Sequence, residues 1–105
     1  FLRGAEGALI GFGTIATSLQ VEMHRTAMAK DYDQALALQR KLDPLVEAIF
    51  GPPVRNYRAR LKEGLVMLGV LERAVVRPPL MPISSQERER IRAALRRLEL
   101  LPAGA

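Results

Sequence analysis

The chain has 105 residues, of which 49% are apolar and 26% charged; this composition is typical of a globular domain and excludes a disordered chain. The absence of cysteine excludes a disulfide framework and a thiolate zinc site, and suits a reducing cytoplasm. The net charge of +5 raises the question of nucleic acid binding. Its arginines, among them Arg55, Arg58 and Arg60, predict a solvated helical surface.

The apolar stretch 8–16 is too short for a membrane helix, which needs ~20 residues. It also lacks the basic lead-in and cleavage pattern of a signal peptide. The sequence begins with Phe1 rather than Met. We therefore expect a segment of a longer protein, with no membrane contact, whose natural N-terminus lies upstream.

Residues 7–13 form a continuous apolar run, which is typical of a parallel strand buried on both faces. Gly11 and Gly13 predict a tight turn at the end of this run. No partner strand is predicted downstream, and a lone strand cannot pair its own backbone N–H and C=O groups. The sequence therefore predicts that the rest of the sheet lies outside this chain.

Four helices are predicted after the strand. The first begins near Thr17 or Ser18, with Thr17 and Gln20 as a capping box, and runs to about Lys30. The second begins at Asp31 and ends before Gly51-Pro52-Pro53. Its core-facing side is predicted from spacings of three and four residues, and consists of Ala35, Leu38, Leu42, Leu45 and Ile49.

The third helix is capped near Asn56 and stops at Gly69, with Leu61, Leu65 and Leu68 on its inner side. Residues 73–83 hold three prolines and are expected to be extended. Ser84 and Glu87 predict a capping box for the last helix, which Pro102 ends. Its inner face consists of Ile91, Ala94, Leu95 and Leu98.

Four motifs in this order resemble the C-terminal part of the dihydrodipicolinate synthase / N-acetylneuraminate lyase family. Gly7-Ala8-Leu9-Ile10 is similar to the family's eighth barrel strand. The second helix, with Asp31-Tyr32-Asp33-Gln34-Ala35, Leu42-Asp43-Pro44-Leu45 and Ile49-Phe50, is similar to a family helix. Lys62 followed by Gly69 matches another, and Arg77-Pro78-Pro79-Leu80-Met81-Pro82-Ile83 resembles the family connector. Two positions depart from the pattern. Thr14 stands where the family has Asn, and Tyr57-Arg58-Ala59-Arg60-Leu61-Lys62 replaces an Asn-x-x-Pro-x-Lys run.

The resemblance implies a mostly α fragment of an α/β TIM barrel. Residues 1–30 would hold the last strand (about 7–13) and its covering helix, residues 31–101 a three-helix C-terminal region, and residues 102–105 a tail. The parent would be a lyase or aldolase that forms a Schiff base (imine) between a lysine and pyruvate or another 2-oxo acid, with no metal or organic cofactor. The family's imine-forming lysine and proton-shuttling tyrosine lie upstream of Phe1, so this segment alone is expected to be inactive. The family's dimers and tetramers imply a homo-oligomer.

The resemblance also implies that Leu9 and Ile10 line the substrate pocket, with Gly11 and Thr14 near its mouth. Small residues at the C-terminal ends of barrel strands leave room for substrate. An interior packing role for Leu9 and Ile10 remains an equal alternative.

Two other functions stay open at this point. A self-standing helical interaction module would have a cooperative helical fold with residues 1–16 disordered. A nucleic-acid-binding domain would use the basic edge formed by Arg88, Arg92 and Arg96, but the interleaved glutamates and the lack of stacking aromatics weigh against it. His24 is expected to be a surface or interface residue, because no second histidine is present to complete a metal site.

Overall fold

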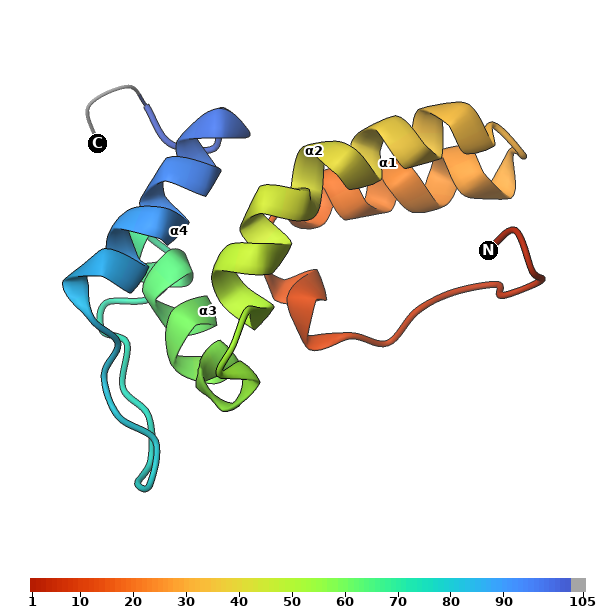
Figure 1. Ribbon diagram of the computed structural model, residues 1–105. Helices are drawn as coiled ribbons and strands as arrows, with labels where there is room; N and C mark the ends of the chain where they lie inside the picture. Colours follow the sequence, from red (N-terminus) through yellow and green to blue (C-terminus); the bar gives the residue numbers. More distant parts are fainter. Residues whose placement is uncertain (103–105) are drawn as a thin grey trace. The chain divides into compact units, whose positions relative to one another are not determined.

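The computed structural model of the chain describes residues 1–102; the other residues of the predicted tail 102–105 lie outside the described residues. Within 1–102 the chain forms four α-helices and two short 3-10 helices, and no strand (Figure 1). It divides into two compact units, Phe1–Asp43 and a second that begins at Pro44. The mostly α prediction with four helices is therefore confirmed, and the predicted strand is not seen within residues 1–102.

The predicted strand over 7–13 is an extended segment followed by a turn. Residues 5–10 have no assigned secondary structure, although Ile10 has extended backbone angles (φ −138°, ψ 143°). Gly11–Thr14 then form the 3-10 helix η1. The physical reason is that a strand is defined by pairing with a neighbour, and no neighbouring strand is present within residues 1–102. The predicted turn at Gly11 and Gly13 is confirmed, and the extended part ends at Ile10.

Helix α1 (Thr17–Met28) begins where the sequence predicts, but its N-terminus is not capped as predicted. Its N-cap residue is Ala16, which lies in the left-handed region (φ 52°, ψ 37°) and makes no side-chain cap. Thr17 and Gln20 do not form the predicted capping box. Both side chains instead donate hydrogen bonds back to carbonyls of residues 12–15.

Helix α2 (Tyr32–Phe50) is the longest, and the backbone N–H of Gln34 donates to the Asp31 carboxylate at its start. The helix therefore begins next to Asp31, as predicted. Four of the five residues predicted to face the core are buried: Leu38, Leu42, Leu45 and Ile49. The boundary between the two units falls inside this helix, between Asp43 and Pro44. Pro44 lacks the N–H that would continue the helical hydrogen bonds there.

The second unit is built around α3 (Tyr57–Met67), which follows the short 3-10 helix η2 (Val54–Asn56) and packs against α4 (Ser85–Arg97) (Figure 1). Gly69 follows α3 with φ +76°, as a helix stop requires. The predicted inner side of α3 is wrong, because Leu61, Leu65 and Leu68 are only half-buried. The residues of α3 that are buried are instead Ala59, Arg60 and Gly64.

Helix α4 follows the sequence prediction in detail. The Ser84 hydroxyl accepts from the backbone N–H of Glu87, and the Glu87 carboxylate accepts from the backbone N–H of Ser84. This reciprocal capping box is as predicted. All four residues of the predicted inner face are buried: Ile91, Ala94, Leu95 and Leu98.

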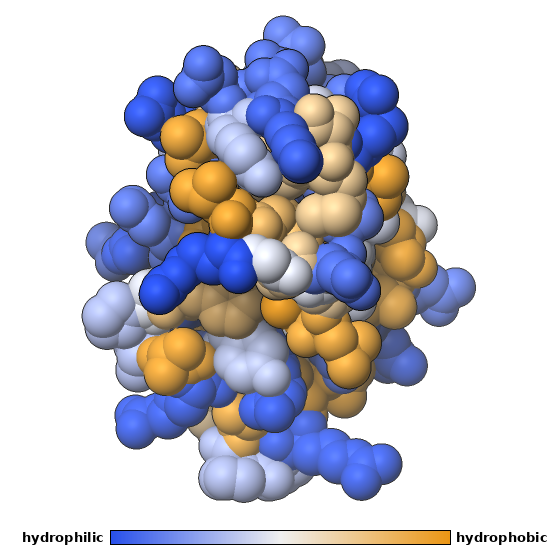
Figure 2. Space-filling view, turned by 90° about the vertical axis from the view of Figure 1, so that its right-hand side faces the viewer, coloured by the Kyte–Doolittle hydropathy of each residue, from blue (hydrophilic) through white to orange (hydrophobic). Residues whose placement is uncertain are grey.

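Apolar side chains also remain on the surface, as the orange areas of Figure 2 show on one face. Leu9 is fully exposed, at 103%, and Ile10 is 54% exposed. Four further large apolar residues of the first unit are exposed: Leu2, Val21, Met28 and Leu36. In the second unit those exposed lie outside the α-helices: Val54, Val70, Val75 and Met81.

Candidate functional site

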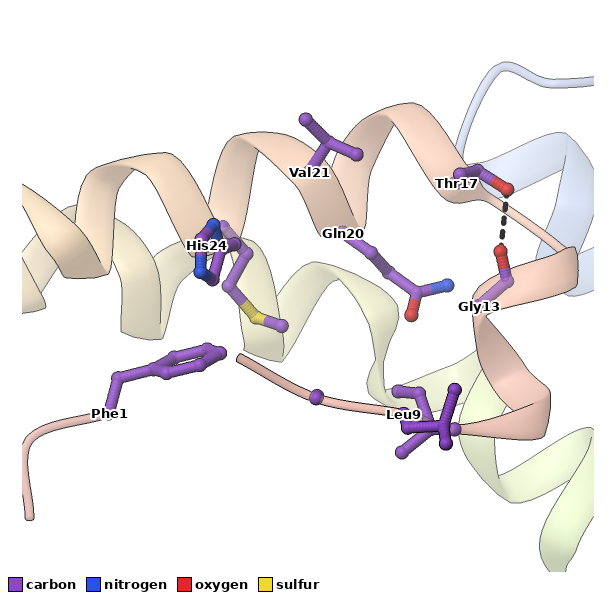
Figure 3. Close-up of a pocket in the computed structure, with 10 residues that line it drawn as sticks. Phe1, Leu9, Gly13, Thr17, Gln20, Val21 and His24 are labelled. Carbon is purple, nitrogen blue, oxygen red and sulfur yellow. Dashed lines mark hydrogen bonds between the residues drawn. The ribbon is translucent and has the colours of Figure 1, made fainter. Parts of the chain in front are cut away.

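A hollow of about 440 Å³ lies in the first unit, between the extended segment and α1 (Figure 3). Leu9 and Ile10, two of the residues predicted to line a substrate pocket, are on its wall. Gly11 and Thr14 are not among its lining residues, and the Thr14 hydroxyl donates to the Gly11 carbonyl at 3.0 Å. The role of all four residues at a substrate pocket stays a prediction. The residues that line the hollow are Phe1, Ala8, Leu9, Ile10, Gly13, Thr17, Gln20, Val21, Met23 and His24.

On the wall that α1 contributes, the polar side chains of Thr17, Gln20 and His24 bind backbone carbonyls. The Thr17 hydroxyl donates to the Gly13 carbonyl at 2.7 Å (Figure 3). The Gln20 amide nitrogen is 2.8 Å from the Phe12 carbonyl and 2.5 Å from the Ile15 carbonyl. These bonds tie η1 to the helix that follows it.

His24 continues the same side of α1. Its Nε2 lies 2.9 Å from the Glu6 carbonyl, and since a carbonyl can only accept, Nε2 carries the proton in this contact. The His24 ring also meets the Phe1 ring edge-on, with 5.1 Å between centroids. His24 was expected to be a surface or interface residue, and this contact with the start of the extended segment was not predicted.

Sequence analysis missed these carbonyl contacts, although a signal for them exists. Thr17, Gln20 and His24 are spaced by three and four residues, which places them on one side of a helix. They follow a glycine-containing turn whose carbonyls lack strand partners. A row of polar residues on the helix that follows such a turn indicates side-chain to backbone bonding.

None of the three lysines is set up as a nucleophile. Lys30 and Lys41 are exposed to water, and the Lys62 ammonium donates to the Val75 carbonyl at 2.5 Å. An imine-forming lysine needs burial or a cationic neighbour to lower its pKa. Nor do residues 1–102 gather three or more histidine or carboxylate side chains that could hold a metal ion.

The buried charge of the second unit is Arg60, which the sequence placed among the solvated arginines; that prediction is wrong, because Arg60 is only 4% exposed. Its guanidinium donates to three backbone carbonyls: Ile49 at 3.1 Å, Gly51 at 2.6 Å and Pro52 at 3.3 Å. Of these three, Ile49 belongs to the last turn of α2, and Gly51 and Pro52 follow the helix. Arg60 also donates to the Glu87 carboxylate at 2.8 Å. A buried guanidinium needs such a set of acceptors, because an unpaired buried charge is costly.

Arg60 and the cap of α4 act together on Glu87. The hydrogen bond from Arg60 is the main cause that holds the pKa of Glu87 below its usual value. Partial burial acts in the opposite direction, and the hydrogen bonds from Ser84 add to the lowering. Glu87 is therefore ionised in the folded unit and connects α3 to the start of α4.

The basic edge of α4 is largely neutralised. Arg88 pairs with Glu63 at 3.1 Å, and Arg92 pairs with Glu89 at 3.1 Å. Arg96 lies 3.7 Å from the same glutamate. A surface that recognises phosphates presents unpaired cations, so these pairs do not favour nucleic acid binding.

None of the helices within residues 1–102 is both long and apolar enough to cross a membrane.

Comparison with known proteins finds relatives that share one name. The chain is 37% identical to 4-hydroxy-tetrahydrodipicolinate synthase of Moorella thermoacetica over 90% of this chain and 33% of that protein. It is 35% identical to the synthase of Nitrobacter hamburgensis over 88% of this chain and 30% of that protein.

A solved structure of a monomeric dihydrodipicolinate synthase variant superimposes with a TM-score of 0.84 at 25% identity, covering 95% of this chain and 32% of that one. The chain thus spans about a third of the length of the relatives it matches. The family resemblance seen in the four sequence motifs is confirmed, although the predicted strand is not seen within residues 1–102. The model of the Dihydrodipicolinate synthetase family matches residues 1–98, and the chain therefore belongs to that family.

Proposed function

We propose that the chain is the C-terminal part of a dihydrodipicolinate synthase-like lyase or aldolase, and that residues 5–10 complete the barrel of the longer protein. The observation that carries this proposal is the extended segment with exposed Leu9 and Ile10. No backbone N–H of residues 5–10 donates to another backbone group within the described chain. Such a segment gains both hydrogen bonds and apolar burial by joining a sheet.

The resemblance to this family supports the following chemistry for the longer protein. A lysine amine upstream of Phe1 attacks the carbonyl carbon of pyruvate or another 2-oxo acid, and water leaves as the imine forms. The protonated imine withdraws electrons, so that a neighbouring carbon–carbon bond forms or breaks, or water is eliminated. The present chain supplies a wall of the pocket at Leu9 and Ile10, with Gly11 and Thr14 near its mouth.

The remaining helices have a supporting role in this proposal. The region 31–101 lies on the outside of the barrel and contributes to contacts between subunits of a dimer or tetramer. The exposed apolar residues Val70, Val75 and Met81 support this role. The absence of cysteine is compatible with work in the cytoplasm.

Reductive trapping tests the reaction. The longer protein is incubated with pyruvate and borohydride, which delivers hydride to the imine carbon and leaves a stable secondary amine on the lysine. Mass spectrometry of the digest should find the label on a lysine upstream of Phe1. The 105-residue chain treated alone is the control and should stay unlabelled at Lys30, Lys41 and Lys62.

The outcomes separate the possible functions. A longer protein that resists labelling by pyruvate and by other 2-oxo acids would contradict the imine mechanism. Labelling of Lys62 in the 105-residue chain would contradict the proposal that this segment is inactive alone.

A further inference from the structure

The turn between the extended segment and α1 is held in an unfavourable backbone conformation. Ala16 has φ 52°, and an alanine in the left-handed region costs about 1–2 kcal/mol relative to the right-handed helix. Ala16 is also 93% buried, since only 7% of its surface is exposed. Such a conformation persists only where the surroundings fix it, and it is typical of functional sites.

Two side chains of α1 bind the backbone that directly precedes Ala16. The Gln20 amide donates to the Ile15 carbonyl at 2.5 Å and to the Phe12 carbonyl at 2.8 Å. The Thr17 hydroxyl donates to the Gly13 carbonyl at 2.7 Å. In Figure 3 Gln20 points from α1 toward the extended segment, and Thr17 points to Gly13.

Of the two carbonyls that Gln20 binds, that of Phe12 also accepts from the backbone N–H of Ile15 at 3.2 Å, whereas that of Ile15 accepts from the Gln20 amide. Ile15 is only 1% exposed, so water cannot reach its carbonyl when the Gln20 donor is removed. One amide group therefore ties a residue inside the turn Gly11–Thr14, and the residue directly after the turn, to the helix. A carboxylate of the same shape could not do this, because it donates no hydrogen bond when ionised.

We propose that Gln20 is a positioning residue that fixes the turn Gly11–Thr14 at the mouth of the 2-oxo acid pocket. This inference rests on the proposed function for the location of the pocket. Gln20 does not touch the reacting atoms; it acts through the backbone of the turn. Loss of its amide lets the turn move, which weakens substrate binding more than it slows the chemical step.

The experiment compares two Gln→Glu variants in the longer protein. Gln20→Glu removes the donor while keeping the side-chain size, and Gln39→Glu makes the same charge change at an exposed position of α2. We expect Gln20→Glu to raise KM for the 2-oxo acid on the order of tenfold, with a smaller change in kcat. Hydrogen exchange should become faster at residues 11–16 and stay unchanged in α4. Gln39→Glu should match the wild type in both measurements.

Each outcome decides the proposal. Equal KM values and equal exchange for Gln20→Glu and Gln39→Glu would overturn it. A lower Tm with an unchanged KM would also overturn it, because the role would then be structural only. Wild-type protein that forms no imine would overturn the proposed function and the pocket assignment with it, whereas wild-type trapping with no effect of Gln20→Glu would overturn the Gln20 role alone.

A second variant keeps the test decisive if Gln20→Glu does not fold. Thr17→Val has nearly the same shape and removes the bond to the Gly13 carbonyl. It should shift KM and the exchange of residues 11–16 in the same direction, by a smaller factor. A wild-type KM for Thr17→Val would overturn the proposal.

Discussion

The two compact units differ in how completely they satisfy their own backbone and side chains. The second unit buries Ile91 and Leu95 completely and surrounds its buried Arg60 with four acceptors. The first unit leaves Leu9 fully exposed and the N–H groups of residues 5–10 without backbone acceptors in the described chain. Under the proposed function, the first unit is therefore the part that would depend on the rest of the longer protein.

The first prediction tests the second unit at Arg60. Arg60→Met removes the guanidinium that donates to the Glu87 carboxylate and to three backbone carbonyls. The change should lower the free energy of unfolding by about 4 kcal/mol. Urea unfolding followed by circular dichroism measures the loss. Arg55→Met, at an exposed position, is the matched control and should change stability little. Equal stability of the two variants would show that the Arg60 contacts do not support the unit.

The second prediction compares the loss of stability on substituting one leucine in each unit. Leu95→Ala should cost about 3 kcal/mol in the 105-residue chain and in the longer protein alike, because Leu95 is fully buried. Leu9→Ala should change the stability of the 105-residue chain little, since Leu9 is exposed there. In the longer protein the same change should cost about 2 kcal/mol. A negligible cost in both forms would contradict burial of Leu9 in a barrel.

The third prediction concerns the start of α4. Ser84→Ala removes the hydroxyl that accepts from the Glu87 N–H, and should cost about 1 kcal/mol. Thermal unfolding measures the change, with Ser85→Ala at the neighbouring exposed position as the control. Equal losses at the two serines would mean that the cap contributes nothing specific.

The smallest expected effect is a dependence on pH. Because Arg60 lowers the pKa of Glu87 in the folded unit, ionised Glu87 contributes stability above its usual value of 4.5. That contribution is lost as the pH falls below 4.5 and through the lowered pKa. Urea unfolding between pH 7 and pH 3 should show a shallower decline for Glu87→Gln than for Glu89→Gln. Identical slopes would contradict the coupling of Glu87 to Arg60.

Local signals in the sequence predicted the parts of the fold that depend on nearby residues. The Ser84–Glu87 capping box, the helix start at Asp31, the Gly69 stop and the buried face of α4 are all confirmed. Each involves residues within one helix or its ends, so the spacing along the chain contains the needed information.

The predictions that failed depend on residues far apart or outside the chain. The strand over 7–13 needs neighbours that are absent from residues 1–102, so apolar composition alone could not produce it. Arg60 meets Glu87 across 27 positions, and no local pattern marks that contact. Thr17 and Gln20 fit the capping-box spacing. Because the N-cap residue Ala16 is left-handed, however, both side chains donate to preceding carbonyls instead.

The residues around the hollow were named only in part. Leu9 and Ile10 border it, although their predicted role in lining a substrate pocket stays a prediction, and Thr17, Gln20 and His24 on the opposite wall were not named. Their role depends on the extended segment passing alongside α1, which the spacing of residues on one helix does not reveal.

Hydrogen exchange at residues 7–10 tests the central claim most directly, because it reports whether these amides have hydrogen-bond acceptors. In the 105-residue chain they should exchange at nearly the rate of an unstructured peptide. In the longer protein they should be protected as strongly as the core of a sheet. Equally fast exchange in both forms would contradict the account that this segment is a strand of a larger barrel.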